Sequence, residues 1–92
     1  MIVSFRDDAT AMLAAGYRVK RFESVERVAR RKLRQLQVAA SLDDLRIPPG
    51  NRLEALTRER AGQHSIRVND KYRVCFRWTP AGAEDVEIVD YH

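Results

Sequence analysis

The sequence predicts an α+β fold in which two helices come first and an antiparallel sheet of about four to five strands packs against them. Apolar residues recur every three or four positions through residues 25–40, which is the period of a helix with one buried face. From residue 52 onward, apolar and polar residues alternate in short runs between turn residues, as strands do. Because a chain of 92 residues can bury only one core, residues 1–92 are expected to form a single domain.

The N-terminal half begins with two short elements. Residues 2–5 alternate weakly and predict a first strand. Asp7 or Asp8 can cap a helix that runs to about Ala15, and Gly16 can end it. These local signals predict a strand followed by a short helix.

The long helix follows a segment with few apolar anchors, residues 16–23, which we expect to be mobile. Ser24 is its candidate N-cap. Its apolar face consists of Val25, Val28, Ala29, Leu33, Leu36 and Ala40. Two prolines and a glycine within residues 42–50 break the helical pattern and are expected to lead into extended chain.

The C-terminal half reads as a meander. Strands are expected over residues 52–56, 63–68, 72–78 and 86–91. Residues 57–62 form a polar, basic loop, and tight turns are expected at 69–70 and 80–82. Ile66 and Val68 share one face of their strand, and the next strand turns Tyr72, Val74, Phe76 and Trp78 to one side.

The charge of the chain is uneven. The net charge of +4 combines eight basic and two acidic side chains in residues 18–34 with four acidic and no basic ones in residues 80–92. A basic surface of this kind indicates a polyanionic partner or simply a solvated helix face. One cysteine excludes an internal disulfide framework and four-cysteine zinc sites, and with only two histidines a zinc site is disfavoured. No membrane-spanning run or secretion signal is seen, so a cytoplasmic location is expected.

Three kinds of reactive side chain can meet in the sheet. Glu54 and Arg73 lie in two predicted strands, and residues 90–92 end the last one. A carboxylate can accept a proton from a hydroxyl, a guanidinium can hold two phosphate oxygens, and an imidazole can protonate a leaving oxygen. This set suits phosphodiester transfer, while each member also has an ordinary role as a solvated, ion-paired or terminal residue.

Three stretches carry a resemblance to a known family: PPGNRLEAL at 48–56, GQHSIRVNDKYRVCF at 62–76 and VEIVDYH at 86–92. Together they resemble the HigB toxins of the RelE/ParE superfamily of bacterial toxin–antitoxin systems, over almost the whole chain. The resemblance implies a RelE-like fold and a metal-independent endoribonuclease that needs no cofactor. It implies an enzyme that cuts mRNA in the ribosomal A site by transfer to the 2′-hydroxyl, which leaves a cyclic phosphate and stops growth.

The same resemblance implies partners and residue roles. A HigA-like helix-turn-helix antitoxin would neutralise the toxin, and operator DNA would be bound only through their complex. Asp90, Tyr91 and His92 match the HigB ending, with His92 as general acid and the other two orienting it or touching the nucleotide. Arg73 matches the arginine that relatives place on the scissile phosphate.

The general base is the least settled role. Glu54 stands where many HigB toxins have a histidine, and it resembles the glutamate base of the related YoeB toxins; His64 is the competing candidate. Further phosphate and RNA contacts are expected from Arg67, Arg58, Arg60 and Lys71.

The basic helix has two possible uses. Residues 18–34 can grip ribosomal RNA or receive an acidic antitoxin. Other classes also stay open: an RNA- or ribosome-binding module without catalysis, and a gyrase inhibitor of the ParE type, against which the terminal Asp-Tyr-His argues. A free-standing transcription factor is disfavoured, because no second helix follows the basic one at a tight turn.

Overall fold

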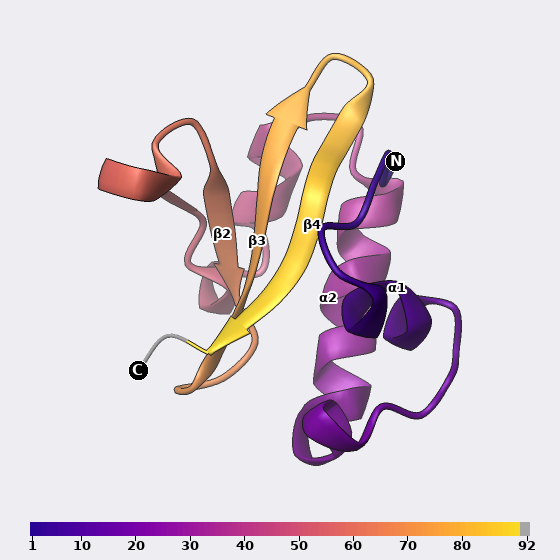
Figure 1. Ribbon diagram of the computed structural model, residues 1–92. Coiled ribbons are helices and arrows are strands. Elements are labelled where there is room, and N and C mark those ends of the chain that lie inside the picture. The colour runs from indigo at the N-terminus through magenta and orange to yellow at the C-terminus, as the bar shows by residue number, and fades with distance from the viewer. Residues whose placement is uncertain (91–92) are drawn as a thin grey trace.

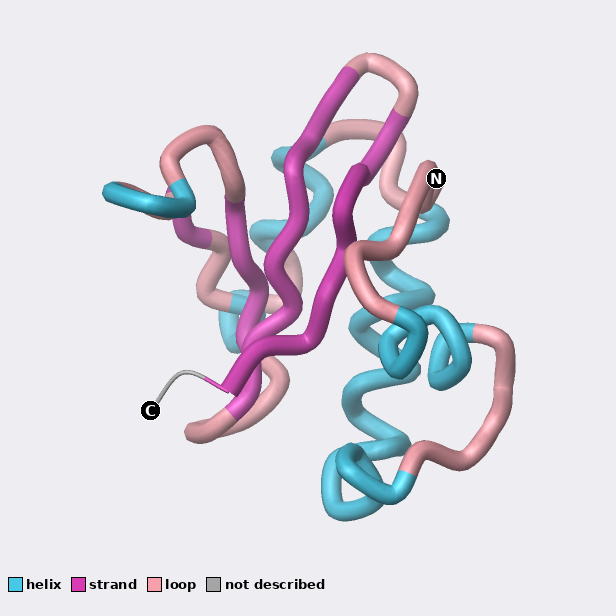
Figure 2. The backbone as a smooth tube through the Cα atoms, viewed as in Figure 1, coloured by secondary structure: helices cyan, strands magenta, loops and turns pink. Residues whose placement is uncertain are grey.

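The computed structural model describes residues 1–90 and has the expected α+β class (Figure 1). Within these residues, four antiparallel strands pair in chain order, as the tube view also shows (Figure 2). The strands are β1 (Glu54–Ala55), β2 (His64–Arg67), β3 (Tyr72–Thr79) and β4 (Gly82–Asp90). The expected strand over residues 52–56 is therefore shorter than predicted, and the last strand begins four residues earlier, at Gly82.

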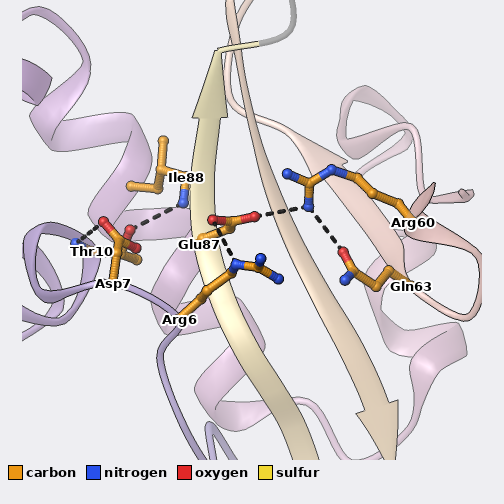
Figure 3. A network of polar contacts seen from close by, with 7 residues as sticks. All are labelled: Arg6, Asp7, Thr10, Arg60, Gln63, Glu87 and Ile88. Atoms are coloured by element: carbon orange, nitrogen blue, oxygen red, sulfur yellow. Dashed lines mark hydrogen bonds and ion pairs between the residues drawn. The ribbon is translucent and has the colours of Figure 1, made fainter.

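Helix α1 (Asp8–Ala14) confirms the local prediction. Asp7 is its N-cap and accepts a hydrogen bond from the Thr10 backbone N–H at 3.2 Å. The buried Thr10 hydroxyl oxygen in turn accepts the backbone N–H of Ile88 at 3.1 Å (Figure 3). This contact fastens the first turn of α1 to β4.

Helix α2 (Glu26–Val38) begins later than Ser24, so the predicted Ser24 cap is wrong. A 3₁₀ helix, Lys20–Val25, precedes it and buries Phe22 completely, with its ring edge-on to Tyr72 at 5.8 Å. Phe22 thus ties residues 16–23 to the core although the segment has few apolar anchors, and its expected mobility stays a prediction. The helix ends before Ala40, which is exposed.

One polar side chain lies on the buried face of α2. Lys32 donates to the side-chain oxygen of the fully buried Asn51 at 2.6 Å, and Asn51 donates to the Leu45 carbonyl at 3.1 Å. Burial, with the nearby Arg31, lowers the pKa of Lys32. The bonds hold residues 42–51 as two 3₁₀ turns, Leu42–Arg46 and Pro49–Asn51, rather than as the extended chain expected after the break.

The expected strand over residues 2–5 is replaced by two isolated parallel bridges to β4, Ile2 to Ala83 and Phe5 to Val86. The N-terminal segment runs alongside β4 and comes closest to it at Gly82, whose φ is +129°. A Cβ atom there would lie 2.1 Å from the Met1 carbonyl oxygen, so only glycine fits this crossing.

The two faces of the sheet differ in their surroundings. The helix-covered face packs Ile66, Val74, Phe76 and Ile88 into the core, all at 2% exposure or less. By alternation the other face, here called the open face, carries Ser65, Arg67, Arg73, Cys75 and Glu87. No helix within residues 1–90 is long and apolar enough to cross a membrane.

Candidate functional site

The strand register places three of the predicted site residues, Glu54, Arg67 and Arg73, on the open face. Glu54 pairs with Ser65, Ser65 with Cys75, and Cys75 with Glu87, so this row crosses all four strands. Arg73 lies two residues before Cys75 on β3 and projects from the same face. Glu54 and Arg73 therefore share a face, as the meander predicted.

Among the described residues, two hydrogen bonds help to hold Arg73 in place. Its Nε donates to the hydroxyl oxygen of the fully buried Ser65 at 2.8 Å, and its Nη2 donates to the Arg52 carbonyl at 2.8 Å. Arg52 occupies the left-handed backbone region, with φ of +46°, at the end of the Pro49–Asn51 turn. Two fixed acceptors on different segments define the plane of the guanidinium, which is half-buried.

The loop between β1 and β2 covers part of the open face. Residues 57–62, which include the 3₁₀ turn Arg58–Arg60, connect β1 to β2, and Arg60 reaches from this loop to Glu87 on β4 (Figure 3). Arg60 Nη1 lies 2.8 Å from the Glu87 carboxylate and donates to the Gln63 side-chain oxygen at 3.1 Å. Arg6 adds a longer contact with Glu87, at 3.7 Å.

The loop turns back at Gly62, where φ is +91°. A Cβ atom there would lie 2.6 Å from Arg77 Nη1, and the Gly62 carbonyl accepts a hydrogen bond from that nitrogen at 3.4 Å. The glycine thus allows the loop to approach the sheet and the Arg77 guanidinium to fasten it.

Cys75 lies on the open face beneath this loop and is fully buried. Burial raises the pKa of its thiol to about 11, Glu87 adds to the rise, and Arg60 and Arg73 oppose it. The thiol is therefore neutral at physiological pH and serves as a small packed side chain.

Beside this loop, residues 54–60 line a hollow of about 380 Å³, and Glu54, Arg58 and Arg60 are among its lining residues. Arg58 is exposed and sits at a positive φ of +56°. Its lining residues include two acidic ones, Glu54 and Glu59, and two basic ones, Arg58 and Arg60. Among residues 1–90, no three His, Cys, Asp or Glu side chains gather as a metal site would require.

The other predicted residues lie apart from this arrangement or outside the described chain. His64 alternates to the helix-covered face, where its ring stacks on Phe76 at 6.3 Å and its Nδ1 is buried without a hydrogen-bond partner among residues 1–90. Arg67 is the exception, because it lies directly opposite Arg73 on the open face, where it pairs with Asp70. Lys71 lies 3.8 Å from Asp90. Asp90 follows Val89, which faces Arg73, so it alternates away from the open face. Tyr91 and His92 fall outside the described residues.

Two residues of this site were missed from the sequence. Ser65 and Glu87 hold Arg73 and Arg60, respectively, yet neither is distinctive as a residue type. Ser65 lies two positions before Arg67, so alternation put it on the same face, but its pairing with Glu54 required the strand register. The contact of Glu87 with Arg60 could be predicted only with both the strand register and the path of the loop over residues 57–62.

Comparison with known proteins gives one family and two relatives. Residues 4–92 match the family described as the RelE-like toxin of the type II toxin-antitoxin system HigB. Over 55 residues, 60% of this chain, it is 51% identical to Toxin HigB-1 of Vibrio cholerae serotype O1. Over 52 residues, 56% of this chain, it is 38% identical to an uncharacterized protein of Haemophilus influenzae. The matched stretches span 58% and 52% of the lengths of these relatives.

Proposed function

Because the chain belongs to the HigB family of RelE-like toxins of type II toxin–antitoxin systems, we propose that it is a ribosome-dependent endoribonuclease that cuts mRNA on its open face. The observation that carries this proposal is Arg73. Its guanidinium is oriented by Ser65 and the Arg52 carbonyl on the same sheet face as the Glu54 carboxylate.

Arg73 binds the scissile phosphate in this proposal. A guanidinium fixed before the substrate arrives stabilises the charge that develops on the phosphate oxygens without having to reorient during the reaction. Arg60 and Arg58, from the neighbouring loop, add positive charge where the RNA backbone would enter, with Arg67 and Lys71 at the far end of the β2–β3 hairpin.

Glu54 is the proposed general base. It is exposed in β1 and lines the hollow with Arg58, whereas His64 stacks against a core phenylalanine on the other face. The geometry therefore favours Glu54 over His64, since a base must reach the 2′-hydroxyl of a substrate that lies on Arg73.

The reaction then balances as a transesterification. Glu54 takes the proton of the 2′-hydroxyl, and the 2′-oxygen forms a bond to the adjacent phosphorus. The bond from phosphorus to the 5′-oxygen breaks, and that oxygen receives a proton from His92 as general acid. The products are a 2′,3′-cyclic phosphate end and a free 5′-hydroxyl end, with Asp90 and Tyr91 orienting His92 or touching the nucleotide.

The partners follow from the family. A type II toxin has an antitoxin partner, and we propose that it is a HigA-like helix-turn-helix protein that brings the complex to operator DNA. The ribosome and its mRNA are the proposed substrate assembly, which places the active protein in the cytoplasm.

The test is to induce the chain in cells and map mRNA ends. Cuts within translated regions that disappear when translation initiation is blocked are the expected result. Ribosome binding without cuts would indicate a non-catalytic binding module. Inhibited supercoiling by purified gyrase, with intact mRNA, would indicate the ParE-type activity instead.

A further inference from the structure

The orientation of Arg73 depends in part on a backbone carbonyl that lies outside the sheet. Arg73 Nη2 donates to the Arg52 carbonyl at 2.8 Å. Arg52 lies between the Pro49–Asn51 turn and β1, with φ of +46° and ψ of +56°. This left-handed conformation is unfavourable for a residue with a side chain, so the surrounding structure must hold it. The direction of the carbonyl therefore depends on what holds the turn.

Asn51, the last residue of this turn, is its anchor. Its side chain is fully buried, and the side-chain oxygen accepts a hydrogen bond from Lys32 Nζ at 2.6 Å. The side-chain nitrogen donates to the Gln35 side-chain oxygen at 3.0 Å and to the Leu45 carbonyl at 3.1 Å. These bonds join the turn to α2 on one side and to the preceding 3₁₀ turn on the other. Because Asn51 directly precedes Arg52, they also fix the chain where it enters the left-handed conformation.

Lys32 is poorly explained as a residue that stabilises the fold. Its side chain is 6% exposed, and among residues 1–90 its ammonium group makes no ion pair. Burying a cation beside a neutral amide costs folding free energy, and an apolar side chain at such a position is often at least as stable. What Lys32 provides is a strong donor to the Asn51 oxygen beneath the turn.

We propose that Asn51 and Lys32 are positioning residues of the active site: through the Arg52 carbonyl, they orient the outer end of the Arg73 guanidinium for the scissile phosphate. The inference rests on the proposed function, because that function supplies the phosphate. Ser65 contacts Nε and the Arg52 carbonyl contacts Nη2, so the second contact acts on the outer nitrogens of the guanidinium. A residue of α2 thus takes part in the chemistry of the opposite sheet face.

A purely structural role of Asn51 and Lys32 leads to different expectations. Loss of a buried hydrogen bond lowers the free energy of unfolding anywhere in a fold, but it leaves the cleavage rate of the folded molecules unchanged. Loss of a positioning residue lowers the maximum rate with little change in substrate binding. Its effect also disappears when the group that it orients has been removed, because the two residues act as one unit.

The experiment measures two properties of the purified full-length toxin. Nitrogen-15 NMR of the Arg73 guanidinium gives the rate of rotation about its Cζ–Nε bond without any substrate. Single-turnover cleavage on programmed ribosomes gives the maximum rate and the half-saturating ribosome concentration. Asn51→Ala removes the anchor, and Lys32→Met removes one donor and leaves Asn51 in place, so it carries the test if Asn51→Ala does not fold. Thr79→Val is the matched control, since it removes hydrogen bonds in the β3–β4 turn, at the far end of β3 from Arg73.

Asn51→Ala is expected to speed the rotation about fivefold and to lower the maximum cleavage rate about tenfold, which is the factor for one hydrogen bond to a charged group. The half-saturating concentration should stay within about twofold of wild type. Lys32→Met should act in the same direction, with a loss of rate of about threefold. Thr79→Val should match the wild type in both readouts, and Asn51→Ala should have no further effect in an Arg73→Ala background.

An unchanged rotation rate in both Asn51→Ala and Lys32→Met overturns the inference, whether or not the toxin cuts mRNA. Faster rotation with an unchanged maximum rate also overturns it, because the orientation would then not matter for the reaction. A loss of rate that persists in the Arg73→Ala background overturns it in favour of a structural role. A wild-type toxin that cuts no mRNA contradicts the proposed function alone, because the rotation rates still test whether Asn51 orients Arg73.

Discussion

The two arginine-rich surfaces of this protein differ in how their guanidinium groups are held. On the open face, Arg73 is fixed by Ser65 and the Arg52 carbonyl, and Arg60 by Glu87 and Gln63. On the outer side of α2, the exposed side chains of Arg27, Arg31 and Arg34 have no hydrogen-bond or ion-pair partner among residues 1–90. The same residue type is therefore oriented on one surface and left adaptable on the other.

Under the proposed function, this difference distinguishes a surface suited to catalysis from one suited to recognition. An oriented guanidinium stabilises a transition state because its position needs no adjustment as charge develops. Long unpartnered side chains can instead adapt to a partner's carboxylates, at a cost in side-chain entropy. Net charge alone does not distinguish the two surfaces, whereas the hydrogen bonds of their arginine side chains do.

The largest effect that tests this contrast is expected from Arg73→Ala. Losing one fixed charge donor typically lowers a catalytic rate by about 10²–10³-fold, and we expect a loss of this size in single-turnover mRNA cleavage. Arg31→Ala, on α2, should leave the rate within twofold of wild type. Circular dichroism of both variants serves as the control for folding. Similar losses in the two variants would erase the distinction between the surfaces.

Glu54→Gln should have the next largest effect, about 10²-fold, because the amide cannot accept the hydroxyl proton. His64→Gln, on the helix-covered face, should keep the wild-type rate in the same single-turnover assay. A larger loss in His64→Gln than in Glu54→Gln would assign the base to the histidine.

Ser65→Ala sharpens the comparison, because it removes the hydroxyl that accepts a hydrogen bond from Arg73 and leaves the guanidinium charge in place. A hydrogen bond to a charged group contributes about 1.5 kcal/mol, so we expect kcat to fall about tenfold with little change in KM. In an Arg73→Ala background the same change should have no further effect on kcat. An undiminished tenfold loss there would mean that Ser65 acts by packing and not through Arg73.

The smallest expected effect concerns Cys75, which is buried on the open face. The pKa of Cys75 is raised in the folded state to about 11 from 9.0. The neutral thiol is thus preferred, its stabilising contribution is complete below pH 9, and it is lost as pH rises to 11. Relative to Cys75→Ala, the wild type should lose about 2 kcal/mol of unfolding free energy between pH 9 and pH 11 in urea titrations. Parallel pH curves would show that the thiol is not desolvated.

The parts of the fold that were predicted correctly depend on neighbours in sequence. The Asp7 cap and the apolar face of β3 are local patterns, so they could be read directly. The burial of Phe22 and Lys32 could not be predicted in this way, because it depends on Tyr72 and Asn51, which are distant in the chain. Longer-range contacts of this kind leave no periodic signal.

The candidate site divides in the same way. Glu54 and Arg73 were expected on one face, and the strand register brings them there. The position of His64 was available from alternation, since it lies two residues before the core residue Ile66. Ser65 as the holder of Arg73 and Glu87 as the partner of Arg60 depend on register and on a loop that folds over the sheet, neither of which the sequence specifies locally.

The most direct test of the account is single-turnover cleavage of mRNA in the A site of purified programmed ribosomes, with wild type, Arg73→Ala and Arg31→Ala compared at equal concentration. The account predicts a 2′,3′-cyclic phosphate end, a rate within twofold of wild type for Arg31→Ala, and a loss of about 100-fold or more for Arg73→Ala. Full activity of Arg73→Ala, or equal losses in both variants, would contradict the assignment of the chemistry to the open face.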